Sequence, residues 1–164
     1  MKIRIKYHNQ NCKITKLGDW IDLRAAETVT LHAPRTRKSS KVHFEDALIS
    51  LGVSMELPKH MEANIVPRSS TYGQYYVMQA NHMGVIDNKY CGDNDIWKMR
   101  VVAFDDTTIH ESDRICQFRI RPTQNAPWWV KLKWFFNSKI EFVEVKSLGN
   151  EDRGGFGSTN NKNN

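Results

Sequence analysis

The chain has 164 residues, of which 40% are apolar and 26% are charged, and it carries a net charge of +6. This length and composition are ordinary for one globular domain that buries a core of its own. No apolar run approaches membrane-spanning length, and Met1–Arg4 leads straight into an alternating segment instead of a signal peptide. We therefore expect a cytoplasmic protein with no membrane partner.

The cysteine usage argues against two further classes of protein. Cys12, Cys91 and Cys116 are odd in number, show no CxxC spacing and have no histidine-rich cluster beside them. Neither a zinc site nor a disulfide framework is expected, and reduced thiols suit a cytoplasm. The basic charge suits a polyanionic partner such as nucleic acid, a membrane surface or a nucleoside triphosphate, although a solvated basic surface explains it as well.

Short segments of alternating residues, separated by Gly and Pro turns, recur along the chain. The first, Lys2–Tyr7, places Ile3, Ile5 and Tyr7 on one face. The other predicted strands are residues 20–23, 28–31, 63–66, 97–104, 115–120 and 140–145, with two more inside 42–57 around a turn at 50–52. The pattern predicts an all-β fold, a jelly-roll-like sandwich or barrel.

Four segments depart from this pattern. Residues 34–41 form a basic stretch that predicts a loop, and residues 105–107 predict a turn. Residues 72–77 fit either a short helix or a strand. From residue 149 onward Gly, Asn, Ser and Thr dominate, so this tail cannot hold a core and is expected to be flexible.

An aromatic and basic stretch, APWWVKLKWFF at residues 126–136, predicts a short amphipathic helix. Trp128, Leu132 and Phe135 or Phe136 are spaced to share one face of it. That face either packs on the body of the protein or on a neighbouring subunit, or it docks a partner protein, nucleic acid or a membrane.

The rest of the chain is organised around residues 84–92, GVIDNKYCG. An apolar run ends here in Asp87, and an aromatic residue, Tyr90, follows three positions later. A carboxylate placed where a strand breaks into a turn can project into a cleft, and Tyr90 can form a wall of that cleft. By itself the stretch is also what a plain strand and turn would look like.

Two other stretches carry chemistry that a core does not need. Asp22 lies inside an apolar strand, where an acid is costly to bury without a partner, so it faces either a polar cleft or a cation. Residues 67–71, PRSST, combine a fixed bend, a fork-shaped cation and three hydroxyls, a set that suits phosphate oxygens as well as an ordinary surface turn.

Five segments in this order resemble the five motifs of the trimeric dUTP pyrophosphatases, the dUTPases. The resemblance extends from about Gly18 to Thr159, and its most specific parts are PRS, GVIDNKYCG and GGFGST. The five segments are GDWIDLRAA around Asp22, PRSST from Pro67, GVIDNKYCG from Gly84, DRICQF from Asp113 and RGGFGST from Arg153.

The resemblance implies a jelly-roll subunit that forms a homotrimer, with C-terminal tail exchange that closes a neighbour's site. Residues 1–148 would form the β-domain and residues 149–164 a lid. The implied reaction is Mg²⁺-assisted hydrolysis of dUTP to dUMP and pyrophosphate, which keeps uracil out of DNA and supplies dUMP for dTMP synthesis.

The third motif would supply the catalytic base and the nucleoside pocket. By resemblance, Asp87 deprotonates the water that attacks the α-phosphorus, and the ring of Tyr90 lies under the deoxyribose and leaves no room for a 2′-hydroxyl. Asn81, with the main chain at Gly84 and Ile86, would bind the uracil edge in a turn too narrow for the thymine methyl.

Phosphate and metal binding would come from the first, second and fourth motifs. By resemblance, Arg68, Ser69 and Gln117 contact the phosphates, and Asp22 holds Mg²⁺ through its water shell. Ser70 stands where the family usually has glycine. In the first motif, residues 19–21 replace the usual small residues.

The fifth motif would close the site. Phe156 matches the aromatic residue that stacks on uracil, and Gly157, Ser158 and Thr159 match the phosphate-binding residues. The family's arginine normally stands two residues further upstream than Arg153, so its contact with the γ-phosphate stays open.

Residues 123–138 are expected to be an insertion between the fourth and fifth motifs. Such segments resemble those of phage-borne dUTPases, some of which also bind regulatory proteins, so residues 126–136 are a candidate protein-binding site. In a phage-encoded enzyme the location would be the host cytoplasm, and nucleic acid is not an expected partner.

Two rival functions remain. The dCTP deaminases share this fold and have an RSS motif, as at Arg68–Ser70, but their catalytic glutamate has no counterpart in residues 93–100. The other rival is a regulatory module that binds through the Trp-rich segment, and it could coexist with catalysis.

Overall fold

The computed structural model describes residues 1–36 and 41–155 and shows a jelly-roll-like β-sandwich. Three sheets contain most of the strands. The first consists of β14 (Glu141–Glu144), β1 (Lys2–Tyr7) and β7 (Val53–Glu56); the second of β10 (Gly84–Asp87), β8 (Met61–Pro67), β13 (Arg114–Pro122) and β2 (Ile21–Arg24); the third of β6 (Asp46–Ser50), β11 (Lys98–Ala103) and β9 (Val77–Gln79).

The remaining elements are short. Two strand pairs are formed by β12 (Thr107–Ile109) with β3 (Val29–Leu31) and by β4 (Arg35–Thr36) with β5 (Val42–His43). The helices are a 3-10 turn at Gln10–Cys12, α1 (Thr71–Tyr75) and α2 (Trp128–Phe136). No helix among the described residues is long and apolar enough to cross a membrane.

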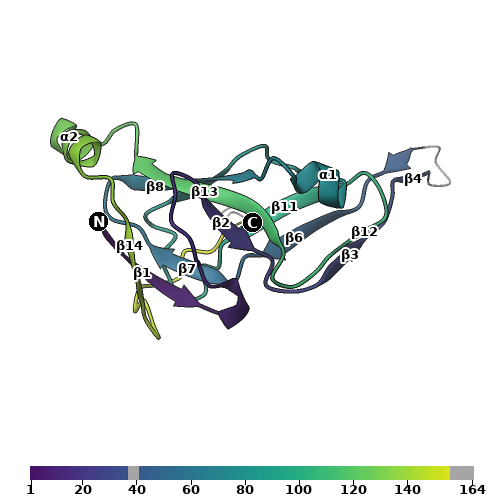
Figure 1. The fold of residues 1–164 in the computed structure, drawn as a ribbon, viewed down its shortest axis with the longest axis horizontal. Coiled ribbons are helices and arrows are strands. Elements are labelled where there is room, and N and C mark those ends of the chain that lie inside the picture. Colours follow the sequence, from purple (N-terminus) through teal and green to yellow (C-terminus); the bar gives the residue numbers. More distant parts are fainter. Residues whose placement is uncertain (37–40, 156–164) are drawn as a thin grey trace, which may run out of the picture.

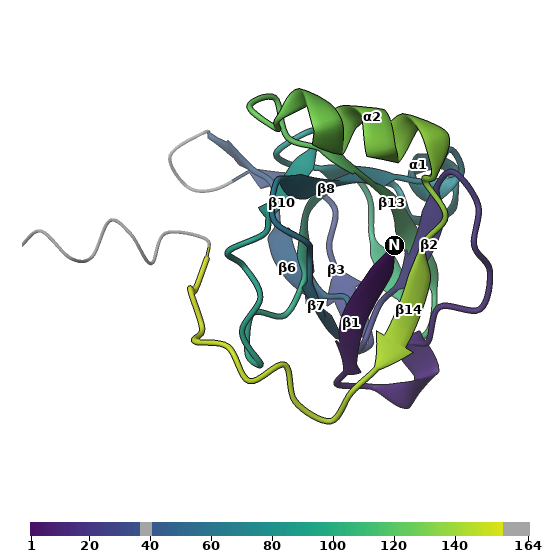
Figure 2. The same ribbon diagram turned by 90° about the vertical axis from the view of Figure 1, so that its left-hand side faces the viewer.

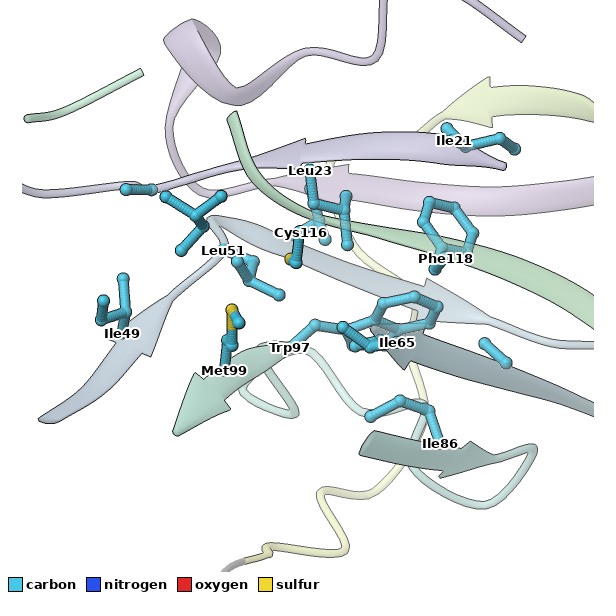
Figure 3. Packing of buried hydrophobic residues seen from close by; sticks show 14 of the residues in the cluster. Ile21, Leu23, Ile49, Leu51, Ile65, Ile86, Trp97, Met99, Cys116 and Phe118 are labelled. Carbon is cyan, nitrogen blue, oxygen red and sulfur yellow. The ribbon is translucent and has the colours of Figure 1, made fainter. Parts of the chain in front are cut away.

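The core lies between the sheets and is made by the inward residues of alternating strands. In β1 the side chains of Ile3 and Ile5 are fully buried, while Lys2, Arg4 and Lys6, which alternate with them, are not, as the alternation predicts. Trp97 and Phe118 pack edge to face in the middle of the core, with ring centroids 5.2 Å apart (Figure 3).

The second sheet is the one that positions the polar residues. Strand β8 lies in its interior and pairs antiparallel with β10 on one side and β13 on the other. Strand β2 then pairs with β13, which sets Asp22 opposite Gln117. Parts of four motifs of the sequence, in β2, at the end of β8, in β10 and in β13, therefore meet in one sheet.

Most predicted strands are confirmed, and the structure corrects two of the other predictions. The expected loop at residues 34–41 is wrong near its start, because Arg35 and Thr36 form a strand that pairs with His43 and Val42. The expected turn at 105–107 ends earlier, since Thr107 begins β12.

The choice between a helix and a strand, left open for residues 72–77, is decided by the structure, and both elements occur there. They supply most of helix α1 and then the first residue of β9. A left-handed backbone at Tyr76, with φ of 49°, separates the two elements.

The predicted helix at 126–136 is confirmed from Trp128 onward, but its aromatic face does not pack on the body. Val130 and Trp134 are the residues that pack against the core cluster. Trp128 is 70% exposed and Phe135 is 79% exposed, so the body of the same chain does not cover this face. A neighbouring subunit and a separate partner remain the two open alternatives for it.

Helix α2 and the β4–β5 hairpin lie at opposite ends of the long axis of the molecule (Figure 1). Seen end-on, α2 lies across one side of the sandwich, and the C-terminal segment runs along another side beside the loop that follows β10 (Figure 2).

Candidate functional site

A pocket of about 310 Å³ surrounds Asp87, and we call it the Asp87 pocket. It is formed where β10 ends and the C-terminal segment passes over it. Its lining is Asn81, Gly84, Val85, Ile86, Asp87, Tyr90 and Lys98, with Arg153, Gly154 and Gly155 from the tail. The structure therefore brings together the predicted residues of the third motif.

Strand β10 directs its residues alternately into the core and outward. Ile86 is buried in the core, and Asp87, the next residue, is partly exposed. One carboxylate oxygen of Asp87 accepts a hydrogen bond from the Lys89 amide at 2.8 Å, and the other forms an ion pair with Arg153. The carboxylate is thus held at the strand-to-turn junction.

Tyr90 forms a fixed wall of the pocket. Its amide bonds to the Asp87 carbonyl at 3.2 Å, and its hydroxyl donates to the Ile96 carbonyl at 3.0 Å. Burial, together with the negative charges of Asp95 and Asp152, raises the pKa of Tyr90 to about 12. The phenol stays neutral at physiological pH, so this wall is an uncharged ring held at both ends.

The turn between β9 and β10 contributes Asn81 to the lining of the pocket. Gln79 is buried and donates to the side-chain oxygen of Asn81 at 3.2 Å and to the Ile65 carbonyl at 3.4 Å. A Cβ on Gly84 would lie 3.3 Å from Ile65, which leaves little room for a side chain there. Gln79, which the sequence did not single out, is therefore the residue that orients Asn81.

The tail lies on the pocket of its own chain as far as the structure describes it. Arg153 pairs with Asp87, and the position of a Cβ on Gly155 lies 3.2 Å from the Tyr90 ring. In the single chain, residues 153–155 line the Asp87 pocket. The closing of a neighbouring chain's site, which the resemblance implies, stays a prediction. The predicted residues Phe156, Gly157, Ser158 and Thr159 lie outside the described residues.

The electrostatics of the pocket favour an ionised Asp87. Burial acts to raise the pKa of this carboxyl group. The hydrogen bonds from Arg153 and the Lys89 amide, and the charges of both cations, outweigh burial and hold the pKa below its usual value. At neutral pH Asp87 is thus a carboxylate, which accepts protons and hydrogen bonds.

A second group of polar residues lies at the other end of β8, and we call it the Asp22 cluster. It consists of Asp22, Arg68, Arg114 and Gln117. Asp22 pairs with Arg68 through Nε at 3.0 Å and with Arg114 through a terminal nitrogen at 3.2 Å. The salt-bridged acid foreseen for Asp22 is thus present, and the two arginines form a cationic surface beside it.

Hydrogen bonds from a buried threonine hold the bend after β8. The hydroxyl of Thr71 accepts from the Arg68 amide at 2.9 Å and donates to the Ile115 carbonyl at 2.8 Å. Ser69 is exposed at this bend, and Ser70 precedes α1 with φ of −87°. Since that φ suits any residue, the serine at the family's usual glycine position causes no strain here.

The two groups of residues are far apart within one chain. Asp87 pairs with Glu62 at the start of β8, and Arg68 lies six residues further along. Six residues of strand span about 20 Å. Asp87 and Arg68 of the same chain therefore cannot contact the same phosphorus atom.

The described residues offer no ready-made metal cage. They contain no group of three or more His, Cys, Asp or Glu side chains that could hold an ion. The Asp22 cluster has one carboxylate among anion-binding arginines. This donor set fits a magnesium ion that is held mainly by substrate phosphates and water, because Mg²⁺ commonly uses one or two carboxylates in such sites.

Comparison with known proteins decides the family. The dUTPase family model matches residues 21–159. The chain belongs to the dUTPase family. It is 47% identical over 165 residues to the SPbeta prophage-derived deoxyuridine 5'-triphosphate nucleotidohydrolase YosS of Bacillus subtilis, and this alignment covers 99% of the chain and all of the relative. A deoxyuridine 5'-triphosphate nucleotidohydrolase of Hydrogenobaculum is 35% identical over 121 residues, which are 73% of this chain and 74% of that one.

Solved structures of dUTPases share the fold. The Streptococcus mutans enzyme aligns with a TM-score of 0.61 and 18% identity over 74% of this chain and 93% of its own. A dUTPase of Staphylococcus aureus phage phi11, described as coordinating a structural Mg(II) ion, aligns with a TM-score of 0.61 and 16% identity over 76% and 93%. The jelly-roll architecture predicted from the sequence is confirmed.

Four residues of this dUTPase take part in the two groups without having been singled out in the sequence. Lys98 lines the Asp87 pocket, Arg114 pairs with Asp22, and Gln79 and Thr71 fix the local backbone or side-chain geometry. Arg114 and Thr71 lie inside two of the five motifs, so their position in a motif was the signal that could have identified them as site residues. The places of Lys98 and Gln79 in the site are set by contacts across the sheet, which no local sequence pattern indicates.

The Arg153–Asp87 pair generates a prediction about titration. In Arg153→Ala the pKa of Asp87 should rise, because burial then acts without its strongest counterweight. NMR titration of the side-chain carboxyl groups measures the shift directly. Arg100→Ala, which removes the partner of Asp46 in another sheet, is the matched control and should leave Asp87 unchanged. An unchanged Asp87 in Arg153→Ala would contradict the pairing.

Proposed function

We propose that this chain hydrolyses dUTP to dUMP and pyrophosphate, with Asp87 as the base for the attacking water. The observation that carries the proposal is the Asp87 pocket, in which an ionised carboxylate lies near the ring of Tyr90 and the side-chain amide of Asn81. The membership of the chain in the dUTPase family supports it further. A carboxylate within reach of a water can deprotonate it as that water attacks the α-phosphorus. The product dUMP would feed dTMP synthesis, and uracil would be kept out of DNA.

The turn from Gln79 to Gly84 and the ring of Tyr90 are proposed to select the nucleoside. Asn81 and the main chain of Gly84 and Ile86 would bind the uracil edge. Tyr90 is held at its amide and its hydroxyl, so it cannot retreat to admit a 2′-hydroxyl. A narrow pocket of this kind rejects larger ligands by steric clash and not by lost contacts.

The Asp22 cluster is proposed to bind the triphosphate. Arg68 offers charge and fork geometry, and Ser69 and Gln117 offer hydrogen bonds to phosphate oxygens. Asp22 would hold Mg²⁺ through water, and the bound ion would neutralise charge on the phosphates. Ser70, at the same bend, would contribute to substrate binding.

The tail is proposed to complete the site as a lid formed by residues 149–164. Phe156 would stack on uracil, and Gly157, Ser158 and Thr159 would bind the β- and γ-phosphates, as their match to the fifth motif implies. Arg153 pairs with Asp87 in the free protein, and incoming phosphate oxygens would compete for its guanidinium group.

A complete site then needs more than one chain, and we propose a homotrimer. Support comes from the roughly 20 Å of strand between Asp87 and Arg68. Further support comes from an exposed apolar surface at the Arg68 end, which a soluble monomer would rarely leave uncovered. Its members are Val42, Phe44, Tyr72, Tyr76, Met78 and Phe104, with the rings of Phe44 and Phe104 5.4 Å apart.

Asp87→Asn tests the base. The substitution keeps the shape of the side chain and removes its proton affinity, so dUTP turnover should fall by about two to four powers of ten while nucleotide binding persists. Pyrophosphate release gives turnover, and calorimetric titration with a non-hydrolysable dUTP analogue gives binding. Asp46→Asn, on the third sheet, is the control and should retain full turnover. Unchanged turnover in Asp87→Asn would refute the role of this residue.

Complementation tests the shared site. Trimers of Asp87→Asn alone and of Arg68→Ala alone should be nearly inactive. Mixed trimers, formed by co-expression and purified through two different tags, should recover activity, because about a quarter of the sites in a random mixture combine an intact Asp87 with an intact Arg68. If both residues came from one chain, the mixture would stay inactive.

We also propose that helix α2 carries a protein-binding face, as a second role that does not replace hydrolysis. The supporting observation is that Trp128, Leu132, Phe135 and Phe136 are exposed while Val130 and Trp134 hold the helix on the core. Large exposed apolar faces commonly mark interaction sites.

A double substitution separates this role from the alternatives. Trp128→Ser with Phe135→Ser should leave both dUTP hydrolysis and the sedimentation coefficient of the trimer unchanged, because neither side chain packs on the core. Trp134→Ser is the contrasting variant and should lower the melting temperature. Dissociation of the trimer in the double variant would instead make α2 a subunit contact and overturn the partner proposal.

A further inference from the structure

Strand β9 carries a buried polar side chain at a position where the core favours an apolar one. Val77 and Gln79 point to the same inner side of the strand, and Met78 is exposed between them. Val77 is 1% exposed and Gln79 is 5% exposed. A buried amide is costly unless its hydrogen bonds are made, so Gln79 needs an explanation that an apolar residue would not.

The hydrogen bonds of Gln79 form a chain that begins at the backbone of β8. Its Nε2 atom donates to the carbonyl oxygen of Ile65 at 3.4 Å and to the Oδ1 atom of Asn81 at 3.2 Å. A carbonyl oxygen can only accept, so Gln79 must turn its NH2 group toward Ile65. That NH2 group can only donate, so Asn81 must turn its own oxygen toward Gln79. The Ile65 carbonyl thus fixes the orientation of both amides.

The turn that carries Asn81 is held in place as well. The Ala80 amide donates to the Arg100 carbonyl at 2.9 Å, and the His82 amide donates to the Gln79 carbonyl at 3.2 Å. These bonds tie the turn to β11 and to the end of β9, and they limit the movement of Asn81 away from Gln79.

Gln79 makes these contacts at a cost to the stability of the fold. Its Oε1 atom is buried and accepts no hydrogen bond from any residue that the structure describes. A buried acceptor without a partner lowers the free energy of unfolding, which an apolar side chain at this position would not do. Packing alone therefore does not account for Gln79, and its contact with Asn81 is the feature that a function would require.

The fixed orientation decides what Asn81 can offer to a ligand. Asn81 is exposed and lines the Asp87 pocket, where the proposed function places the uracil edge. Its Oδ1 atom is bonded to Gln79, so the group left for a nucleobase is the Nδ2 donor. Uracil carries a carbonyl oxygen at carbon 4, which accepts from such a donor. Cytosine carries an amino group there, which is itself a donor and would leave both groups unpaired.

We infer that Gln79 is a positioning residue that fixes Asn81 as a hydrogen-bond donor and so selects uracil against cytosine. The inference rests on the proposed function, in which Asn81 binds the uracil edge, and adds the residue that sets the direction of that hydrogen bond. Gln79 acts through Asn81 and does not touch substrate. Without Gln79 the Asn81 amide could rotate by half a turn and present its oxygen to the amino group of cytosine, so both bases would be accepted.

Gln79→Leu tests this role, because leucine fills a similar volume and cannot donate. Calorimetric titration with the α,β-imido analogues of dUTP and dCTP, which differ only in the base, gives the two dissociation constants. The preference for the dUTP analogue should fall by about ten- to a hundredfold in the variant. Met99→Leu, a volume-conserving substitution at a buried position of β11, is the control and should keep the preference. An unchanged preference in Gln79→Leu would overturn the inference.

The melting temperature separates this role from a structural one. It should not fall in Gln79→Leu, because the substitution removes a buried polar group with an unpaired oxygen. A lower melting temperature with an equal loss of affinity for both analogues would make Gln79 a structural residue and overturn the inference. If the leucine variant does not fold, Gln79→Met gives the same test with an unbranched side chain, and failure of both variants to fold has the same meaning as that equal loss.

A double substitution tests whether Gln79 acts through Asn81. Asn81→Ala should lower the same preference, and the addition of Gln79→Leu should lower it little further, because the two residues act as one unit. Losses that simply add would mean that Gln79 acts on the base by another route, and they would overturn the inference.

Binding of the analogues needs no turnover, so failure of the inference and failure of the proposed function are distinguishable. If the unaltered protein prefers the dUTP analogue but releases no pyrophosphate from dUTP, the proposed hydrolysis fails, and Gln79→Leu still decides the inference. If hydrolysis proceeds and the preference is unchanged in Gln79→Leu, only the inference fails. An unaltered protein that binds both analogues equally would overturn the inference, because it would make no selection.

Discussion

The length of strand β8 fixes the distance between Asp87 and Arg68 within one chain, and the arrangement of the whole site depends on that distance. Its first residues pair with β10 and place Asp87 at one end of the sheet, and its last residue leads into Arg68 at the other. Backbone pairing on both sides prevents either end from moving toward the other. A reaction that needs both residues at one phosphate therefore requires contact between chains, and the apolar surface near α1 offers a place for it.

The sequence predicted the features that local chemistry determines. Alternation located β1, and an apolar run that ends in an acid located Asp87 at the end of β10. The five ordered motifs identified the family, which the comparisons confirm. What local pattern could not predict is pairing between distant segments. Asp95 and Gln79 look like ordinary loop and strand residues until the tail and the β9–β10 turn are in place.

Helix α2 is a second example of what a local sequence pattern cannot predict. Spacing correctly predicted a helix, but the face that packs is set by Val130 and Trp134 and not by the most aromatic row. Spacing alone could not rank two apolar faces of one short helix, because Trp128 and Phe135 are as apolar as the residues that the body covers.

The most direct test of the account is pyrophosphate release in the presence of Mg²⁺ from dUTP, dCTP, UTP and dTTP, with ammonia measured in the dCTP sample. The account predicts pyrophosphate from dUTP alone, because the Tyr90 ring would exclude the ribose of UTP and the narrow turn would exclude the thymine methyl. Ammonia from dCTP would indicate a deaminase and contradict the account. No reaction with any of the four nucleotides would contradict it as well, and would point to a fold retained for binding.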